Sequence, residues 1–330
     1  MRRDRISRLA DRRRLYTNET YDQARSQLNP GQPPIPAPPG EQRNFEAELF
    51  YRLLYSHHFT QYPFGIRRVR PGTDSITLEV ESEQRAEEIL NRILPAQEPD
   101  GEVHGIPAVR VRRRTQNGIE VHQCGRRTSA WLTGLPAYVW KRVEAACLDT
   151  LADIAWRPLW KGPAEWTDEE ALSEQHWNTG EWMRHFQDGA WSGSGLLRRL
   201  AVLHTVVPAD AVTGYKGLPI RGYDGMGPVR WCLDLCHRTG IRYRKEELVD
   251  ALTDAEFGLP VAIARHLDRI YPQHTMKNWV RLDDQARTGL IELRFCTFNY
   301  PELRVGTAGA KDRAIAEGIQ ARVDIALASD

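Results

Sequence analysis

The sequence predicts an α+β protein in which an antiparallel sheet domain with packed helices precedes a mainly helical C-terminal domain. Residues 42–150 alternate between stretches with an apolar residue at every second position, the strand pattern, and stretches with the helical spacing of three to four. Residues 151–330 show mostly the helical spacing. With 330 residues, 41% of them hydrophobic, the chain is long and apolar enough for two or three packed domains.

Composition limits what the whole chain can do. Lys and Arg number 45 and Asp and Glu 44, so any attraction to nucleic acid or to a membrane surface has to be local. No apolar run in the sequence approaches the roughly 18 residues of a membrane-spanning helix. The five scattered cysteines are typical of thiols in a reducing compartment. We therefore expect a cytoplasmic protein that needs no cofactor.

Residues 1–28 are rich in arginine and have apolar residues near helical spacing, which predicts a basic arm of two short helices. Such an arm can contact phosphates, and the alternative is a solvated tail. The arginines expected to make phosphate contacts are Arg2, Arg3, Arg5, Arg12, Arg13 and Arg14. Residues 29–41 follow with six prolines and predict a semi-rigid linker in the polyproline II conformation, or alternatively a proline-rich ligand for a partner.

The α+β domain is expected over residues 42–150, with helices at 45–55, 83–94 and 137–151 and five strands among them. One of these strands contains the run VRVRRR. Alternation places Val109 and Val111 inward, and Arg110, Arg112 and Arg114 in water. This arginine row either binds anions or is an ordinary solvated sheet face.

Residues 152–192 contain six of the ten tryptophans in an acidic context. Acidic residues repel the phosphates that accompany stacked bases, so the tryptophans are interpreted as core anchors or as a protein-contact surface. A protein-interaction module built on this segment is one alternative function.

Residues 208–228 contain five glycines and Lys216, but the lysine does not follow a glycine and precede a hydroxyl residue as in a phosphate-binding loop. The segment is interpreted as a long loop, and an enzyme of unknown class using it is a second alternative function. No catalytic residue can be named, since the histidines and serines form none of the hydrolase motifs.

Cys232, Cys236 and His237 suggest a metal site, but a structural zinc site usually needs a second ligand pair, which the sequence lacks. The two cysteines are therefore placed on the apolar face of a helix, and no metal is expected. A final helix over 308–327 is expected either to close the domain or to mediate homo-oligomer formation.

The segment 246–294 resembles a helix-turn-helix DNA-binding domain, possibly with a wing. Ile263, Ala264 and Leu267 match the packed positions of the first helix, and Thr275 opens a second helix in which Met276 and Val280 point inward. Residues 291–295 alternate like the first strand of a wing.

The resemblance implies that the second helix reads duplex DNA. The residues placed on its exposed side or flanking it are His274, Thr275, Lys277, Asn278, Arg281, Arg265 and Arg269. Their donors suit base edges and phosphates. The expected function is therefore DNA binding, in regulation or in replication of a bacterial replicon.

Overall fold

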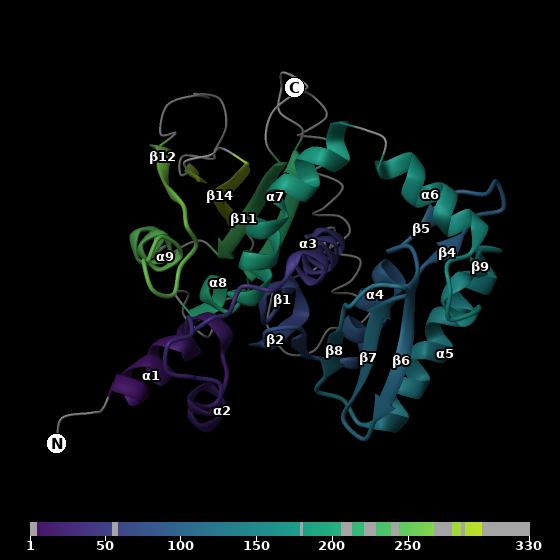
Figure 1. Ribbon diagram of the computed structural model, residues 1–330, viewed down its shortest axis with the longest axis horizontal. Coiled ribbons are helices and arrows are strands. Elements are labelled where there is room, and N and C mark those ends of the chain that lie inside the picture. The colour runs from purple at the N-terminus through teal and green to yellow at the C-terminus, as the bar shows by residue number, and fades with distance from the viewer. Residues whose placement is uncertain are drawn as a thin grey trace.

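A computed structural model describes residues 5–54, 59–178, 181–205, 213–220, 229–238, 244–266, 279–284 and 288–298. These residues form three mostly antiparallel sheets surrounded by helices, which confirms the predicted α+β class (Figure 1). The helices are α1 (Arg5–Thr17), α2 (Tyr21–Ser26), α3 (Gly40–Leu54), α4 (Glu83–Ile93), α5 (Ala137–Asp153), α6 (Asp168–Asn178), α7 (Glu181–Arg198), α8 (Val202–Thr205) and α9 (Lys245–Leu252), with 3₁₀ turns η1 (Pro63–Gly65) and η2 (Leu159–Lys161).

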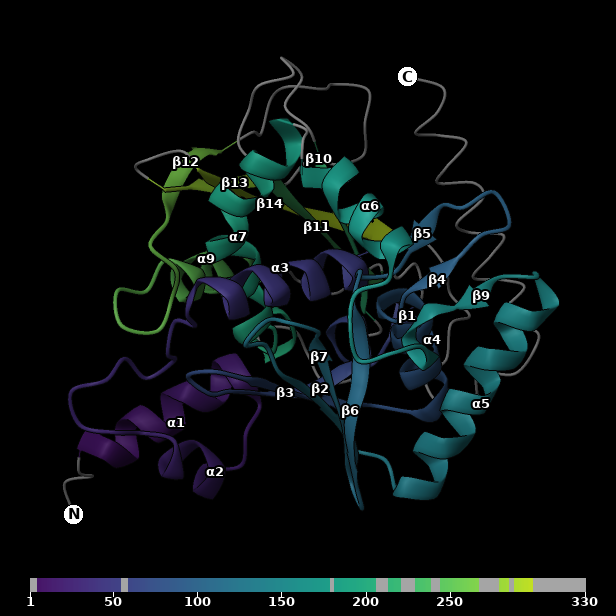
Figure 2. The same cartoon turned by 45° about the vertical axis from the view of Figure 1, so that its right-hand side comes forward.

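A five-stranded sheet forms much of the predicted α+β domain. Its strands, in sheet order, are β2 (Ile66–Pro71), β3 (Ile76–Val80), β8 (Ala130–Thr133), β7 (Gly118–Gln123) and β6 (Val109–Thr115). Only the β3–β8 pair is parallel. Helices α4 and α5 lie side by side next to this sheet (Figure 2), and α4 begins where the Ser82 side chain accepts a hydrogen bond from the Arg85 amide.

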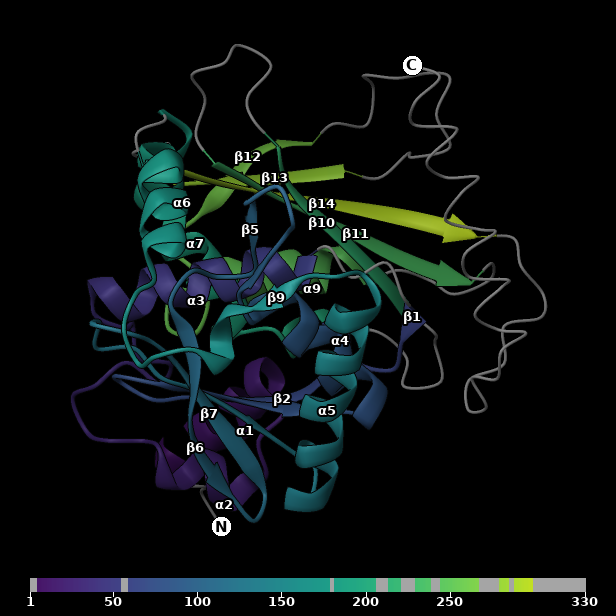
Figure 3. The same cartoon turned by 90° about the vertical axis from the view of Figure 1, so that its right-hand side faces the viewer.

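A six-stranded sheet lies in the C-terminal half, where the sequence predicted mainly helices. Its order is β1 (Phe59–Thr60), β10 (Thr213–Ile220), β11 (Val229–Arg238), β14 (Gly289–Phe298), β13 (Trp279–Asp283) and β12 (Ala262–His266). The β11–β14 pair is parallel and the others are antiparallel. Helices α3 and α7 lie between this sheet and the five-stranded sheet (Figure 3).

The core of the six-stranded sheet is centred on Trp231 of β11. Its indole nitrogen donates to Ser192 Oγ at 2.8 Å, and its ring centroid lies 5.5 Å from that of Phe50 on α3. Gly193 on α7 lies directly against the indole, and a Cβ atom at this position would clash with the ring. The absence of a side chain at Gly193 is therefore what allows α7 to approach the sheet.

The arginine-rich segment forms the two predicted helices, but it is packed on the body of the protein and is not a solvated tail. Tyr16 of α1 is buried, stacks on Phe257 with ring centroids 5.4 Å apart, and donates to the Ala251 carbonyl at 2.9 Å. The proline-rich linker is also packed on the body, since Ile35 is 3% exposed. Buried apolar contacts hold both segments on the body of the protein. The hydrophilic composition of the arm gave no sign of these contacts in the sequence.

Two other predicted elements are wrong because the chain has the strand period there. Residues 213–220 of the predicted glycine-rich loop are strand β10, and Cys232 lies on strand β11. In β11 the apolar residues Trp231, Leu233 and Leu235 alternate with polar ones and are buried. The predicted C-terminal helix at 308–327 lies outside the described residues.

A small sheet joins β5 (Val103–His104), β4 (Ala96–Gln97) and β9 (Arg157–Pro158) in that order. Both of its strand pairs are antiparallel. Of the helices that the structure describes, none has the length and apolar character needed to span a membrane.

Candidate functional site

Where the structure describes the segment predicted as a helix-turn-helix, the segment starts with helix α9 and continues with strands β12, β13 and β14. Ile263 and Ala264 belong to β12, and Arg281 belongs to β13. Val280 and Leu282 are fully buried, so the run from 279 to 283 has the period of two. The helical interpretation is wrong at these strands because Val280 fits both periods. The predicted strand character of residues 291–295 is confirmed, since they belong to β14, which lies between β11 and β13 in the six-stranded sheet.

Most of the predicted DNA-contacting residues lie between these two strands. Arg269, His274, Thr275, Lys277 and Asn278 fall in residues 267–278, outside the described residues. Arg265 and Arg281 are described, and they are register partners on the antiparallel strands β12 and β13. The structure therefore brings together two predicted residues that the sequence placed on separate helices.

Two neighbouring register rows cross this face of the six-stranded sheet. One row runs Leu218, Cys232, Glu292, Arg281, Arg265, and the next runs Lys216, Asp234, Arg294, Trp279. Positions two apart on a strand share a face, so both rows lie on one face, opposite the side of Trp231 that packs on α7. Of the charged side chains that the structure describes in these rows, Arg281 and Arg294 are basic and Glu292 is acidic.

Accessibility on this face increases toward the sheet edge. Glu292 is 2% exposed and lies 3.6 Å from Arg294 Nε, whereas Arg281 is partly exposed. Among the described residues, Arg281 Nε is a buried donor without a hydrogen-bond partner. A guanidinium with an unused donor next to a second arginine favours an anionic ligand.

The predicted phosphate contacts of the arm are mostly occupied by the protein itself. Arg13 is fully buried, and its Nε donates to Glu19 at 2.6 Å. Arg12 pairs with Asp254 at 2.6 Å and Arg14 with Asp11 at 3.7 Å. Arg13 therefore has a structural role and is not available to a phosphate.

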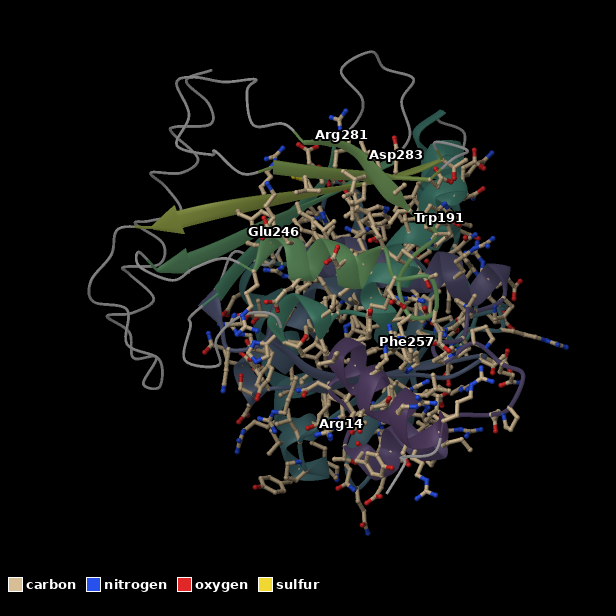
Figure 4. All side chains as sticks on the ribbon, turned by 90° about the vertical axis from the view of Figure 1, so that its left-hand side faces the viewer. Arg14, Trp191, Glu246, Phe257, Arg281 and Asp283 are labelled. Carbon is tan, nitrogen blue, oxygen red and sulfur yellow. The ribbon has the colours of Figure 1, made fainter. Side chains whose placement is uncertain are left out.

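The other arginines of the arm are either exposed or outside the described residues. Arg5 is exposed at the start of α1, and Arg2 and Arg3 lie outside the described residues. Figure 4 shows Arg14 and Arg281 at opposite ends of the molecule. The arm and the six-stranded sheet therefore do not form one continuous basic surface.

The arginine row of VRVRRR is likewise paired. Arg110, predicted to lie in water, is 5% exposed and donates to Glu170 at 2.8 and 2.7 Å. Arg114 donates to Glu144 at 2.9 and 2.7 Å. A bulge between Val111 and Arg113 interrupts the simple alternation.

The tryptophan-rich segment supplies anchors at the positions that the structure describes. Trp160 is buried, Trp166 donates to the Cys124 carbonyl at 2.9 Å, and Trp191 donates to Thr288 Oγ1 at 3.0 Å. These contacts support the interpretation as core anchors. The side chains of Trp177 and Trp182 lie outside the description.

A cavity that the sequence did not indicate lies between α3, α6 and the residues after β5. Its volume is about 40 Å³, which is room for roughly three waters. The lining residues are Glu48, Tyr51, Arg52, Val103, Gly105, Ile106, Pro107, Ser173, Glu174 and Phe186. Glu48 Oε2 is a buried atom that has no hydrogen-bond partner among the described residues. A second carboxylate, Glu174, accepts from Arg126 at 2.8 Å.

The pKa of Glu48 is raised to about 7, mainly by burial and also by the charge of Glu174, against the opposing effects of Arg126 and Arg52. A carboxyl group that titrates near neutrality can donate or accept a proton. The sequence contained no sign of this pair, because Glu48 and Glu174 are far apart in the chain and each looks like an ordinary helical glutamate.

Comparisons with protein-family models, with curated proteins and with solved structures found no match to this chain.

Proposed function

We propose that the protein binds duplex DNA through the edge hairpin formed by β12 and β13, in regulation or replication. The observation that carries the proposal is the register pairing of Arg265 with Arg281. Like charges directly opposite one another on a sheet are unfavourable unless an anion compensates them. A DNA phosphate or an acceptor on a base edge supplies this compensation.

The major groove of DNA admits β-strands as well as a helix, so an edge pair of strands can contact it. Strand β12 is an outer strand of the six-stranded sheet, so the hairpin lies at the sheet edge. Residues 267–278, which connect the two strands in the sequence, add Arg269, His274, Thr275, Lys277 and Asn278. In this proposal these residues, which lie outside the described part of the chain, make the DNA contacts that the sequence suggested.

The test is fluorescence anisotropy with a labelled DNA duplex at two salt concentrations. The wild-type protein should bind, and binding should weaken as salt increases. Arg281→Ala should reduce affinity by about 5- to 160-fold, the equivalent of about 1–3 kcal/mol if the side chain reads a base edge. A smaller loss with a flatter salt dependence would indicate a phosphate contact.

The matched control is Arg113→Ala. Arg113 is 68% exposed on β6 of the five-stranded sheet, so its replacement removes the same charge far from the hairpin. Melting temperatures of both variants establish that they are folded. The proposal is wrong if the wild type does not bind DNA, or if the two variants lose affinity equally.

A further inference from the structure

Three possible metal ligands meet on the small sheet, in a part of the molecule away from the β12–β13 hairpin (Figure 1). The carboxylates of Glu98 and Glu102 and the imidazole of His104 have ligand atoms that all lie within 4.8 Å of one another. We propose that Glu98, Glu102 and His104 bind a divalent transition-metal ion, zinc being the best match. This inference is independent of the proposed DNA binding.

The backbone of the β4–β5 hairpin holds the three proposed ligands in place. His104 pairs with Ala96 across β5 and β4, and the Glu98 amide donates to the Glu102 carbonyl at 2.8 Å. Gly101 supplies the turn with a φ of +100°, a conformation that L-residues rarely adopt. All three ligands therefore come from one short turn whose geometry is fixed by main-chain hydrogen bonds.

The histidine distinguishes this group from a pair of surface acids. His104 Nε2 is a buried atom that lies 2.5 Å from Glu98 Oε1, yet it has no hydrogen bond of normal geometry. The imidazole also stacks on Trp156, with ring centroids 4.5 Å apart and an angle of 17° between the planes. The stacking on Trp156 holds the imidazole with Nε2 beside the Glu98 carboxylate, so an imidazole ligand and a carboxylate ligand already lie next to each other.

The ligand types select the metal class. One imidazole and two carboxylates suit zinc and similar ions, with bonds of roughly 2.0–2.2 Å. Such bonds place neighbouring ligand atoms roughly 3.3 Å apart, and the three ligand atoms here lie within 4.8 Å of one another. The side chains of His104 and Glu98 are 37% and 28% exposed, so an ion can enter from solution. With three protein ligands, water completes the coordination.

The test is calorimetric titration of the full chain with Zn²⁺, together with Co²⁺ titration followed by tryptophan fluorescence. The wild-type protein should bind Zn²⁺ at the β4–β5 hairpin, and Co²⁺ should quench the fluorescence of Trp156. His104→Ala and Glu102→Gln should each remove one equivalent of bound Zn²⁺ or weaken its binding at least about tenfold.

Asp100→Asn is the matched control, because it removes a charge from the same turn without removing a proposed ligand. Asp100 Oδ1 accepts from the Glu102 amide, so melting temperatures are compared as well. Trp156→Phe identifies the quenched fluorophore among the ten tryptophans. The proposal is overturned if the Asp100 and Glu102 variants lose the same affinity. It is also overturned if His104→Ala leaves the stoichiometry and affinity unchanged, because the histidine and Glu98 then form only an ion pair.

Discussion

Arg198 at the end of α7 and Glu46 in the middle of α3 form a buried ion pair with two hydrogen bonds, of 2.7 and 2.6 Å. The same guanidinium donates to the carbonyls of Pro36 and Gly72, at 2.7 Å in each case. Arg13 of α1 makes equivalent contacts, because its guanidinium donates to the carbonyls of Pro34 and Pro71. Two buried arginines thus attach the proline-rich linker to the β2–β3 turn.

The first prediction concerns this pair. Arg198→Ala leaves the Glu46 carboxylate buried and unpaired, so it should lower the free energy of unfolding by about 3–5 kcal/mol. Arg142→Ala is the control, because Arg142 pairs with Glu83 and the two side chains are 60% and 38% exposed. An exposed pair should contribute much less than the buried one. Urea unfolding of both variants checks this, and similar losses would show that burial of the pair does not matter.

The second prediction concerns the N-terminal helices. The packed Tyr16 predicts that deletion of residues 1–28 lowers the melting temperature, whereas deletion of a solvated tail would leave it unchanged. Tyr16→Ala alone should cost about 3–5 kcal/mol, the range for a buried aromatic residue. Leu15→Ala, at a neighbouring residue that is 52% exposed, should cost much less. A deletion variant that melts like the wild type would contradict the packing of the arm.

The third prediction is a pH dependence of stability caused by Glu48. The folded pKa of about 7 lies above the ordinary value of 4.5, so the folded state holds a proton that the unfolded state releases between these values. Stability from this group is therefore fully present below about pH 4.5 and is lost as the pH rises through 7. The shift corresponds to about 3 kcal/mol.

Glu48→Gln removes the titration while keeping the shape of the protonated side chain. The variant should match the wild type near pH 5 and be more stable than the wild type at pH 8, as measured by urea unfolding at each pH. The difference in unfolding free energy between the two proteins at each pH cancels the contributions of the other carboxyl groups. One of these is Glu144, which accepts hydrogen bonds from Arg114 and Lys161. A difference that does not change with pH would show that Glu48 titrates normally.

The fourth prediction concerns the contact between Gly193 and Trp231. Gly193→Ala should destabilise the protein by about 1–3 kcal/mol, because the added methyl group meets the indole in a closely packed core. In an exposed helix the same change would be favourable. Trp231→Phe removes the ring atoms nearest to Gly193, so the double variant should be more stable than the sum of the single losses predicts. Strictly additive losses in a double-mutant cycle would disprove the contact.

The sequence alone determined the α+β class, the helices at α1, α2, α4 and α5, and the strand character of residues 291–295. These elements have a clear period in the chain, and the period depends only on which residues are apolar. At Val280 the period does not identify the type of element. It fits a helix with Met276 and a strand with Leu282, and only its burial in a sheet decides between the two.

The tertiary structure decided everything that depends on partners distant in sequence. The parallel pairing of β11 with β14 joins residues about 60 positions apart, such as Trp231 and Ile291, and no local pattern encodes it. The same holds for Arg110 and Glu170, and for Arg281 beside Arg265. A charged residue has the same sequence signature whether it meets water, a buried carboxylate or a ligand. Its role is set by the desolvation and the neighbouring charges that only the folded chain supplies.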